Sequence, residues 1–197
     1  MNFKKLQEMQ RALDDAILKE KPEMTAEERF EKTCVALSVE VAELANTAEH
    51  FKFWKENKGK VDESILTEIG YASRDNKYYH HKSNCICSFE EAHKLTLVEE
   101  ASDCLHFILS LANQLNVDLG LNFDKKNTLK LETDEKYYLF MLNRIHLLNV
   151  RRWEEDSITM LYSFLGYTES LGITQEELEQ AYYEKNEVNY QRLEQGY

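Results

Sequence analysis

The sequence is poor in residues that interrupt helices, and it has no long apolar run. It contains one proline and six glycines among 197 residues. No stretch approaches the ~18 consecutive apolar residues of a membrane span, and no apolar signal-peptide core is present. Two of the four cysteines fall within helical patterns. We therefore expect a soluble, cytosolic, reduced protein with no membrane partner and no structural disulfides.

Basic residues are also scarce relative to acidic ones. The chain has 24 Lys and Arg against 36 Asp and Glu, which gives a formal net charge of −12. A chain this acidic is not expected to use a nucleic-acid polymer as its main partner. If its ligand is an anion, a cation must offset the local repulsion, and we expect that cation to be a metal ion.

Helical periodicity is what the sequence has in abundance. Apolar residues recur every three or four positions, and charged residues make up 30% of the chain. The pattern predicts an all-α fold: a helical bundle of six to seven helices in a single domain over residues 1–197. The expected helices cover residues 3–19, 25–54, 89–116, 134–153, 157–171 and 174–194. Three capping boxes are expected to start helices, at Thr25/Glu28, Ser88/Glu91 and Thr174/Glu177.

Residues 59–88 interrupt the helical pattern. They are polar and aromatic with weak periodicity, and we expect an insertion: a surface loop with a short helix, serving as a lid or an interface arm. A zinc site is the alternative for this stretch. Its candidate ligands are His80, His81, Cys85 and Cys87. The CxC spacing with adjacent histidines matches none of the common zinc patterns, which disfavours that alternative.

Two pairs of carboxylates lie beside apolar helix faces. Glu40 and Glu43 are three apart on one expected helix, and Glu100 and Asp103 are three apart on another. Each pair on its own also fits a solvated helix face. If the two helices pack antiparallel, however, four carboxylates converge, and they cannot all ionise there without cations. Oxygen ligands in that number suit Mg²⁺ or Mn²⁺.

Two further features agree with a metal-dependent site. The last helix places Lys185, Asn189 and Arg192 on its inward face, where they either extend past the core to solvent or line an anion-binding cleft. The first helix places Gln10 within its apolar face and Gln7 at its edge. These amides are either satisfied core groups or readers of a pyrimidine edge. Carboxylates that hold metal, opposite a cationic face, are what hydrolysis of a phosphoanhydride requires.

Four stretches carry a resemblance to a known family. They are LQEMQRALDDAI (6–17), LSVEVAELANTAEHFKFWK (37–55), EEASDCLHFILSLA (99–112) and AYYEKNEVNYQRLEQGY (181–197). ExxE followed by ExxD, with FKFWK and YxxKNxxNxxR, resembles the dimeric all-α dUTPases of the all-α NTP pyrophosphatase superfamily. The stretches cover about a third of the chain. The departure is spacing, because Glu43 and Glu100 lie 57 positions apart where the family usually has a short gap.

The resemblance implies roles for individual residues. Two or more Mg²⁺ ions, which Mn²⁺ can replace, would be held by Glu40, Glu43, Glu100 and Asp103. The phosphates would be bound by Lys185, Asn189, Arg192 and Tyr182. The uracil base would be bound by Gln10, Gln7, Trp54, Phe107 and His50.

The resemblance also implies a reaction and an assembly. The family hydrolyses dUTP, and also dUDP, to dUMP with release of pyrophosphate or phosphate. A metal-activated water attacks the phosphoanhydride, and Glu40 or Glu43 assists as the catalytic base. A homodimer is implied. Two other functions stay open: a pyrophosphohydrolase for dCTP or a modified nucleotide, and a non-catalytic helical interaction protein.

Overall fold

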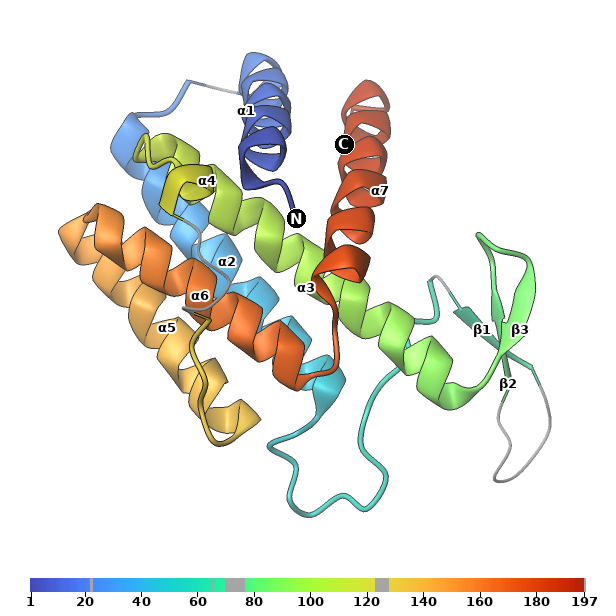
Figure 1. Cartoon of the computed structure of the whole chain (residues 1–197). Helices are drawn as coiled ribbons and strands as arrows, with labels where there is room; N and C mark the ends of the chain where they lie inside the picture. The colour runs from blue at the N-terminus through green and yellow to red at the C-terminus, as the bar shows by residue number, and fades with distance from the viewer. Residues whose placement is uncertain (22, 65, 70–76, 123–127, 197) are drawn as a thin grey trace.

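The computed structural model describes residues 1–21, 23–64, 66–69, 77–122 and 128–196. Seven helices and one three-stranded sheet form this part of the chain (Figure 1). The helices are α1 (Phe3–Glu20), α2 (Ala26–Ala48), α3 (Phe89–Gln114), α4 (Leu119–Asn122), α5 (Asp134–Arg151), α6 (Glu154–Ser170) and α7 (Gln175–Glu194). The strands are β1 (Leu66–Ile69), β2 (Lys77–His80) and β3 (Cys85–Cys87). The predicted all-α class is confirmed.

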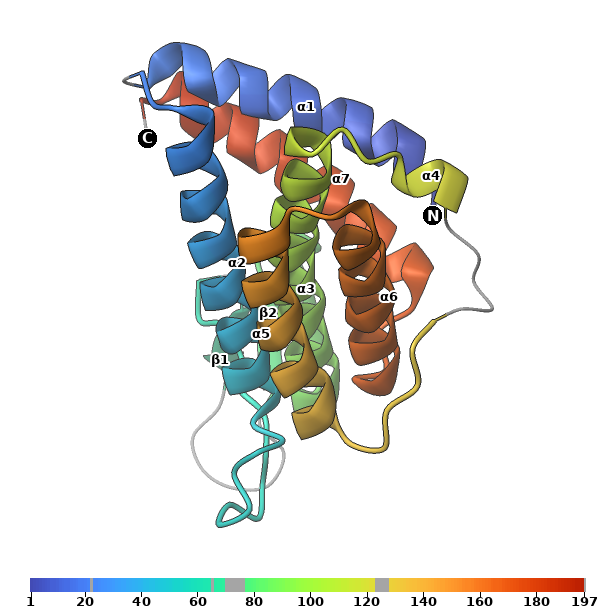
Figure 2. The same ribbon diagram turned by 90° about the vertical axis from the view of Figure 1, so that its left-hand side faces the viewer.

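The helices are arranged around α3. Helices α2, α3, α5 and α6 run side by side, and α1 and α7 lie across one end of them (Figure 2). Helix α3 contacts α1, α2, α6 and α7. Its Leu105 and Ile108 are fully buried, as are Leu37, Val41 and Leu44 of α2, so the predicted apolar faces meet in one core. No described helix combines the length and the apolar character that crossing a membrane requires.

The predicted capping boxes start α2, α3 and α7. At each site the Ser or Thr hydroxyl accepts from the backbone N–H three residues on, and the Glu there accepts from the cap backbone. These reciprocal bonds satisfy N–H groups that have no partner within the helix. The ends of α5 and α6 differ from the prediction by a few residues. Arg152 adopts a left-handed conformation with φ 59° and ends α5 at Arg151, and α6 begins at Glu154.

Helix α2 ends six residues earlier than predicted. Glu49 adopts a left-handed conformation with φ 54°, and its side chain is only 2% exposed. Its carboxylate accepts from Lys52 Nζ at 2.7 Å, from Lys55 Nζ and from the Gly59 backbone N–H at 3.0 Å. Burial opposes ionisation, but these hydrogen bonds lower the pKa of Glu49 to about 2. The loop therefore closes on a buried charge, and the predicted helical positions of His50, Phe51 and Trp54 are wrong.

The expected insertion at 59–88 contains strands rather than a short helix; residues 65 and 70–76 of it lie outside the described part. Antiparallel pairing joins Thr67 to Tyr79 and Tyr79 to Ile86, so β2 is the central strand. Tyr78 and Cys87 face a small second core with Leu66 and Ala92. Such a sheet alternates buried and exposed positions, which a search for helical periodicity does not detect.

The structure does not bring the four candidate zinc ligands of this stretch together. His80 Nδ1 lies 2.7 Å from Ser83 Oγ, and His81 Nε2 lies 2.9 Å from Thr67 Oγ1. Within the described residues, the His, Cys, Asp and Glu side chains close enough to share a metal ion are three carboxylates elsewhere, and none of the four zinc candidates is among them.

Candidate active site

Helices α2 and α3 bring three of the four predicted carboxylates together. Each of Glu40, Glu100 and Asp103 offers a carboxylate oxygen, and these oxygens all lie within 4.8 Å of one another. We call these three residues the carboxylate cluster. All three side chains are partly buried. Glu43 lies one turn from Glu40 on α2, is exposed, and is outside the cluster, although its charge acts on both glutamates of the cluster.

Electrostatics in the carboxylate cluster oppose full ionisation. Burial, followed by the charges of Asp103 and Glu43, raises the pKa of Glu40 to about 7. Burial, followed by the charge of Glu43, raises the pKa of Glu100 to about 7. Burial also raises the pKa of Asp103, against the lowering effect of Lys185. Acidic groups crowded in this way need cations or protons.

Lys185 of α7 supplies one positive charge to this site. Its Nζ donates to Asp103 Oδ2 at 2.7 Å and to Glu99 Oε1 at 3.2 Å. Although burial works against it, these two carboxylates raise the pKa of Lys185 above its ordinary value. The predicted cationic face therefore does reach the carboxylates. Of its other members, Arg192 is exposed and lowers the pKa of Asp103, and Asn189 is half-buried.

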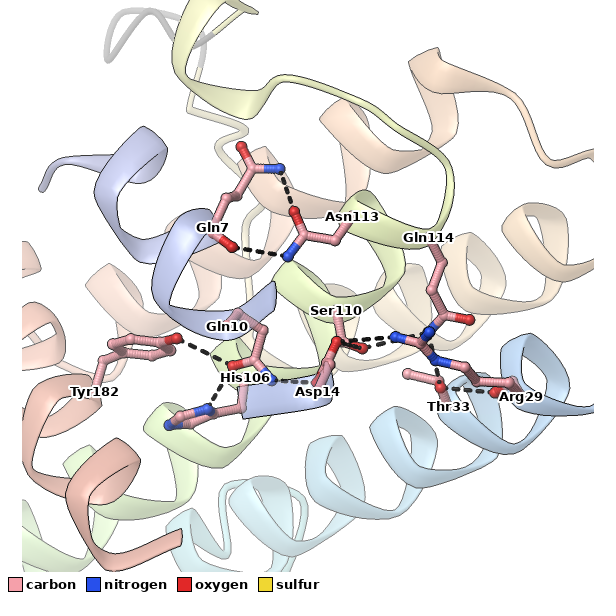
Figure 3. A network of polar contacts seen from close by, with 10 residues as sticks. All are labelled: Gln7, Gln10, Asp14, Arg29, Thr33, His106, Ser110, Asn113, Gln114 and Tyr182. Atoms are coloured by element: carbon pink, nitrogen blue, oxygen red, sulfur yellow. Dashed lines mark hydrogen bonds and ion pairs between the residues drawn. The ribbon is translucent and has the colours of Figure 1, made fainter. Parts of the chain in front are cut away.

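Gln10 lies in a buried polar network where α1, α3 and α7 meet (Figure 3). Its Oε1 accepts from the Tyr182 hydroxyl at 3.1 Å and lies 2.7 Å from His106 Nδ1. Its Nε2 donates to Asp14 Oδ1 at 2.8 Å. The other Asp14 oxygen accepts from Ser110 Oγ at 2.7 Å. The Gln10 amide therefore has a fixed orientation, with a carboxylate on its nitrogen side and donors on its oxygen side.

Gln7 makes a separate set of contacts one turn away. Its Nε2 donates to Asn113 Oδ1 at 3.2 Å and to Val117 O at 2.8 Å. Its Oε1 accepts from the Leu119 N–H at 3.0 Å. Both ends of this amide hold α1 against the segment that joins α3 to α4. A base could pair with Gln7 only by displacing these contacts.

The remaining base-pocket candidates lie in two regions: His50 and Trp54 both contact Phe51 in the loop after α2, and Phe107 belongs to α3. Trp54 is 65% exposed and meets Phe51 and Phe53 edge-on in the loop after α2. His50 Nε2 lies 2.7 Å from the Tyr167 hydroxyl. Phe107 lines a cavity of about 280 Å³ beside Asp14, Arg29 and Ser110.

Three polar residues of this region were not predicted from the sequence: Asp14, His106 and Asn186. His106 and Asn186 are 5% exposed. Within the described part of the chain, His106 Nε2 and Asn186 Nδ2 are buried and meet no partner in full hydrogen-bond geometry. Tyr182 lies near both, because its backbone acts on the pKa of His106 and Asn186 acts on the pKa of its hydroxyl. The His106 ring stacks on Tyr182, with centroids 4.2 Å apart. Their positions in the sequence could have indicated two of these residues as candidates. His106 follows the predicted ligand Asp103 by three positions on an apolar helix, and Asn186 directly follows Lys185.

Comparison with known proteins gives the family. A family model described as dUTPase matches residues 2–70 and 88–197. The chain belongs to the all-α dUTPase family. No curated protein matches it. Membership assigns dUTP hydrolysis to the chain and makes it a dUTP diphosphatase, and the carboxylate cluster agrees with the divalent metal that dUTPases generally use. Residues 71–87, which include β2 and β3, lie outside the match.

Proposed function

We propose that this dUTP diphosphatase depends on Mg²⁺ and cleaves dUTP, and also dUDP, to dUMP with release of pyrophosphate or phosphate. The observation that carries the proposal is the carboxylate cluster, in which Glu40, Glu100 and Asp103 come together although burial and mutual repulsion raise their pKa values. Hard oxygen donors that repel one another are a fitting ligand set for Mg²⁺ or Mn²⁺.

Glu43 would complete the ligand set from the next turn of α2. When bound, one or more Mg²⁺ ions would offset the phosphate charge and activate the attacking water. Glu40 and Glu43 are the candidates for the catalytic base, because Glu40 belongs to the carboxylate cluster and Glu43 lies one turn from it on α2.

The phosphate groups would be bound from α7. Lys185 already donates to Asp103, so its ammonium group lies at the edge of the carboxylate cluster, where a phosphate would meet the metal ligands. Arg192, Asn189 and the Tyr182 hydroxyl would add donors along the same helix. Charge-assisted hydrogen bonds from such donors are the strong ones in phosphate recognition.

The uracil edge would be recognised in the Gln10 network. Because Gln10 Oε1 accepts, the facing His106 Nδ1 carries a proton, and Nε2 is then an acceptor. Burial lowers the pKa of His106 to about 3, which keeps the ring neutral. An acceptor at His106 Nε2 and a donor at Asn186 Nδ2 complement the N3–H and a carbonyl of uracil. Cytosine has an acceptor at N3, which would face another acceptor.

The other predicted base residues have smaller roles in this proposal. Phe107 would form a wall of the base pocket from the cavity beside Asp14. Gln7 would fix α1 so that Gln10 keeps its position. Trp54 and His50, which lie in the loop after α2, would contact the nucleotide only if that loop closes on it.

Assembly and location also belong to the proposal. Helices α2 and α5 pack side by side and carry exposed apolar side chains, which would suit a homodimer interface. These are Val35 at 63%, Val39 at 47%, Leu139 at 63% and Val150 at 65% exposed. We expect a cytoplasmic homodimer. Light scattering of wild type and of Val39→Lys tests the assembly.

The decisive experiment measures phosphate and pyrophosphate release from dUTP, dUDP, dCTP, dTTP and UTP, with Mg²⁺ and with EDTA. Fast, Mg²⁺-dependent cleavage of dUTP and dUDP alone is the expected result. Equal cleavage of dCTP would remove the uracil-reading role of the Gln10 network and keep the metal chemistry. Full activity in EDTA would refute the role of the carboxylate cluster in metal binding.

A further inference from the structure

A second pocket adjoins the carboxylate cluster, between α3 and α7 and beneath the turn that joins β2 to β3. Its volume is about 270 Å³. Its apolar floor comes from the two helices. Its polar lining consists of Ser64, His80, His81, Lys82, Glu99, Glu184 and Lys185.

Lys185 and Glu99 connect this pocket to the carboxylate cluster. Lys185 lines the pocket and donates to Asp103 Oδ2 at 2.7 Å, so a ligand in the pocket and a metal ion on Asp103 would share one lysine. Figure 1 shows the sheet beside the N-terminal end of α3, away from α1. The pocket therefore extends the candidate active site on the side that the insertion covers.

The insertion supplies the cationic roof of the pocket. Lys82 forms an ion pair with Glu184 of α7, and His80 also acts on the charge of Glu184. Hydrogen bonds to Ser83 and Thr67 orient the rings of His80 and His81. Without a ligand, the positive charges of the two pocket lysines are balanced by Glu184, which pairs with Lys82, and by Glu99, which pairs with Lys185. A cation bound at the carboxylate cluster would replace Lys185 as the partner of Asp103. Lys185 would then have a hydrogen-bond donor for a phosphate, while Glu99 stays beside it.

We propose that this pocket binds the terminal phosphate of dUTP, with Lys82 and the two histidines of the insertion as its specificity-determining contacts. The inference rests on the proposed function, because the phosphates must first lie at the carboxylate cluster. The contacts come from residues 80–82, inside the segment that the family match leaves out. The pocket would thus favour dUTP over dUDP, which lacks that phosphate.

The first test compares Lys82→Ala with wild type and with Lys77→Ala. Lys77 is exposed on the same strand as His80 and does not line the pocket, so it is the matched control. We expect Lys82→Ala to lower kcat/KM for dUTP by about tenfold, mainly through KM, with dUDP unchanged. The fold should persist, because exposed ion pairs contribute little to stability.

The second test does not depend on turnover. The ring signals of His80 and His81, assigned with His80→Gln and His81→Gln, are followed by NMR while inorganic pyrophosphate is added to the Mg²⁺-loaded enzyme. The proposal expects both signals to shift in wild type and in Lys77→Ala, and to require several-fold more pyrophosphate in Lys82→Ala.

The outcomes separate the two levels of the proposal. If wild type hydrolyses dUTP with Mg²⁺ but Lys82→Ala keeps the wild-type ratio of dUTP to dUDP turnover, the terminal-phosphate pocket is wrong and the proposed function stands. If the enzyme is active but the signals of His80 and His81 do not shift when pyrophosphate is added, the terminal-phosphate pocket is also wrong and the proposed function stands. Absence of Mg²⁺-dependent dUTP hydrolysis in wild type overturns both.

Discussion

The two cluster glutamates should make the metal-free protein lose stability as pH rises. The unfolded chain releases these protons near pH 4.5, whereas the native state holds them to about pH 7. A group with a raised native pKa weakens the native state progressively between those two values. The full shift corresponds to about 3 kcal/mol per group at 1.36 kcal/mol per pKa unit. Because solvent screens partly exposed groups, we expect about 1 kcal/mol for each between pH 5 and pH 8.

The assay is urea unfolding in EDTA at pH 5 and pH 8 for wild type, Glu40→Gln and Glu100→Gln. Glutamine keeps the side-chain shape and removes the titration. His106 acts in the opposite direction, because its lowered pKa costs stability as pH falls below 6.5. The informative quantity is therefore the free energy of unfolding of each variant minus that of wild type. We expect this difference to become more positive by about 1 kcal/mol from pH 5 to pH 8.

Mg²⁺ should reverse this pH effect in wild type but not in Glu40→Gln or Glu100→Gln. At 100 times its dissociation constant, a ligand that binds the native state alone adds about 2.7 kcal/mol. Glu31→Gln, on an exposed position of α2, is the matched control and should behave as wild type. If both cluster variants show the same pH dependence as wild type, the raised pKa values, and the crowding that explains them, are refuted.

Three further outcomes are expected. Asp103→Asn and Glu43→Gln should each lower kcat for dUTP at least about 100-fold with an unchanged circular dichroism spectrum, and wild-type turnover would exclude either residue from the mechanism. Gly166→Ala should lower the free energy of unfolding by about 1–3 kcal/mol in urea titrations, because its new Cβ would lie 2.2 Å from Leu129 O, and an unchanged midpoint would contradict that contact. Glu49→Gln should speed hydrogen exchange over residues 50–59, since the loop closes on this carboxylate, and unchanged exchange would show that other contacts hold it.

Helix starts and the carboxylate pairs could be predicted from sequence because they are local. Thr25 and Glu28 are three residues apart, and so are Glu100 and Asp103, so one turn of helix determines each pair. The packing of α2 against α3 then follows from their apolar faces, although these faces do not determine the relative direction of the two helices. Lys185 could be placed on the inward face for the same reason, although its partners Glu99 and Asp103 could not be identified.

The parts that failed depend on contacts that helical periodicity does not encode. Phe51 continues the apolar spacing of α2, and that spacing does not reveal that Glu49 is buried with Lys52, Lys55 and Gly59 as its partners. The Gln10 network is similar. Its partners in α3 and α7 lie 96 and 172 positions away, so the sequence indicated a buried amide but not what would satisfy it.

The carboxylate cluster should release protons when it takes up metal. In the metal-free protein, Lys185 is the lysine that contacts the cluster and Glu99, which together have four acidic side chains. Protons on Glu40 and Glu100 remove part of the negative charge that Lys185 does not balance. Two groups with pKa values of about 7 hold roughly one proton between them at pH 7. A divalent cation would displace that proton.

Calorimetric titration of Mg²⁺ in buffers of different ionisation enthalpy measures this release. We expect about one proton per site at pH 7 and close to none at pH 9, where both glutamates are already ionised in the metal-free protein. Glu100→Gln should release about half as much at pH 7, and Glu31→Gln as much as wild type. Equal release at both pH values would mean that the protons come from elsewhere, and that Lys185 alone balances the cluster before metal binds.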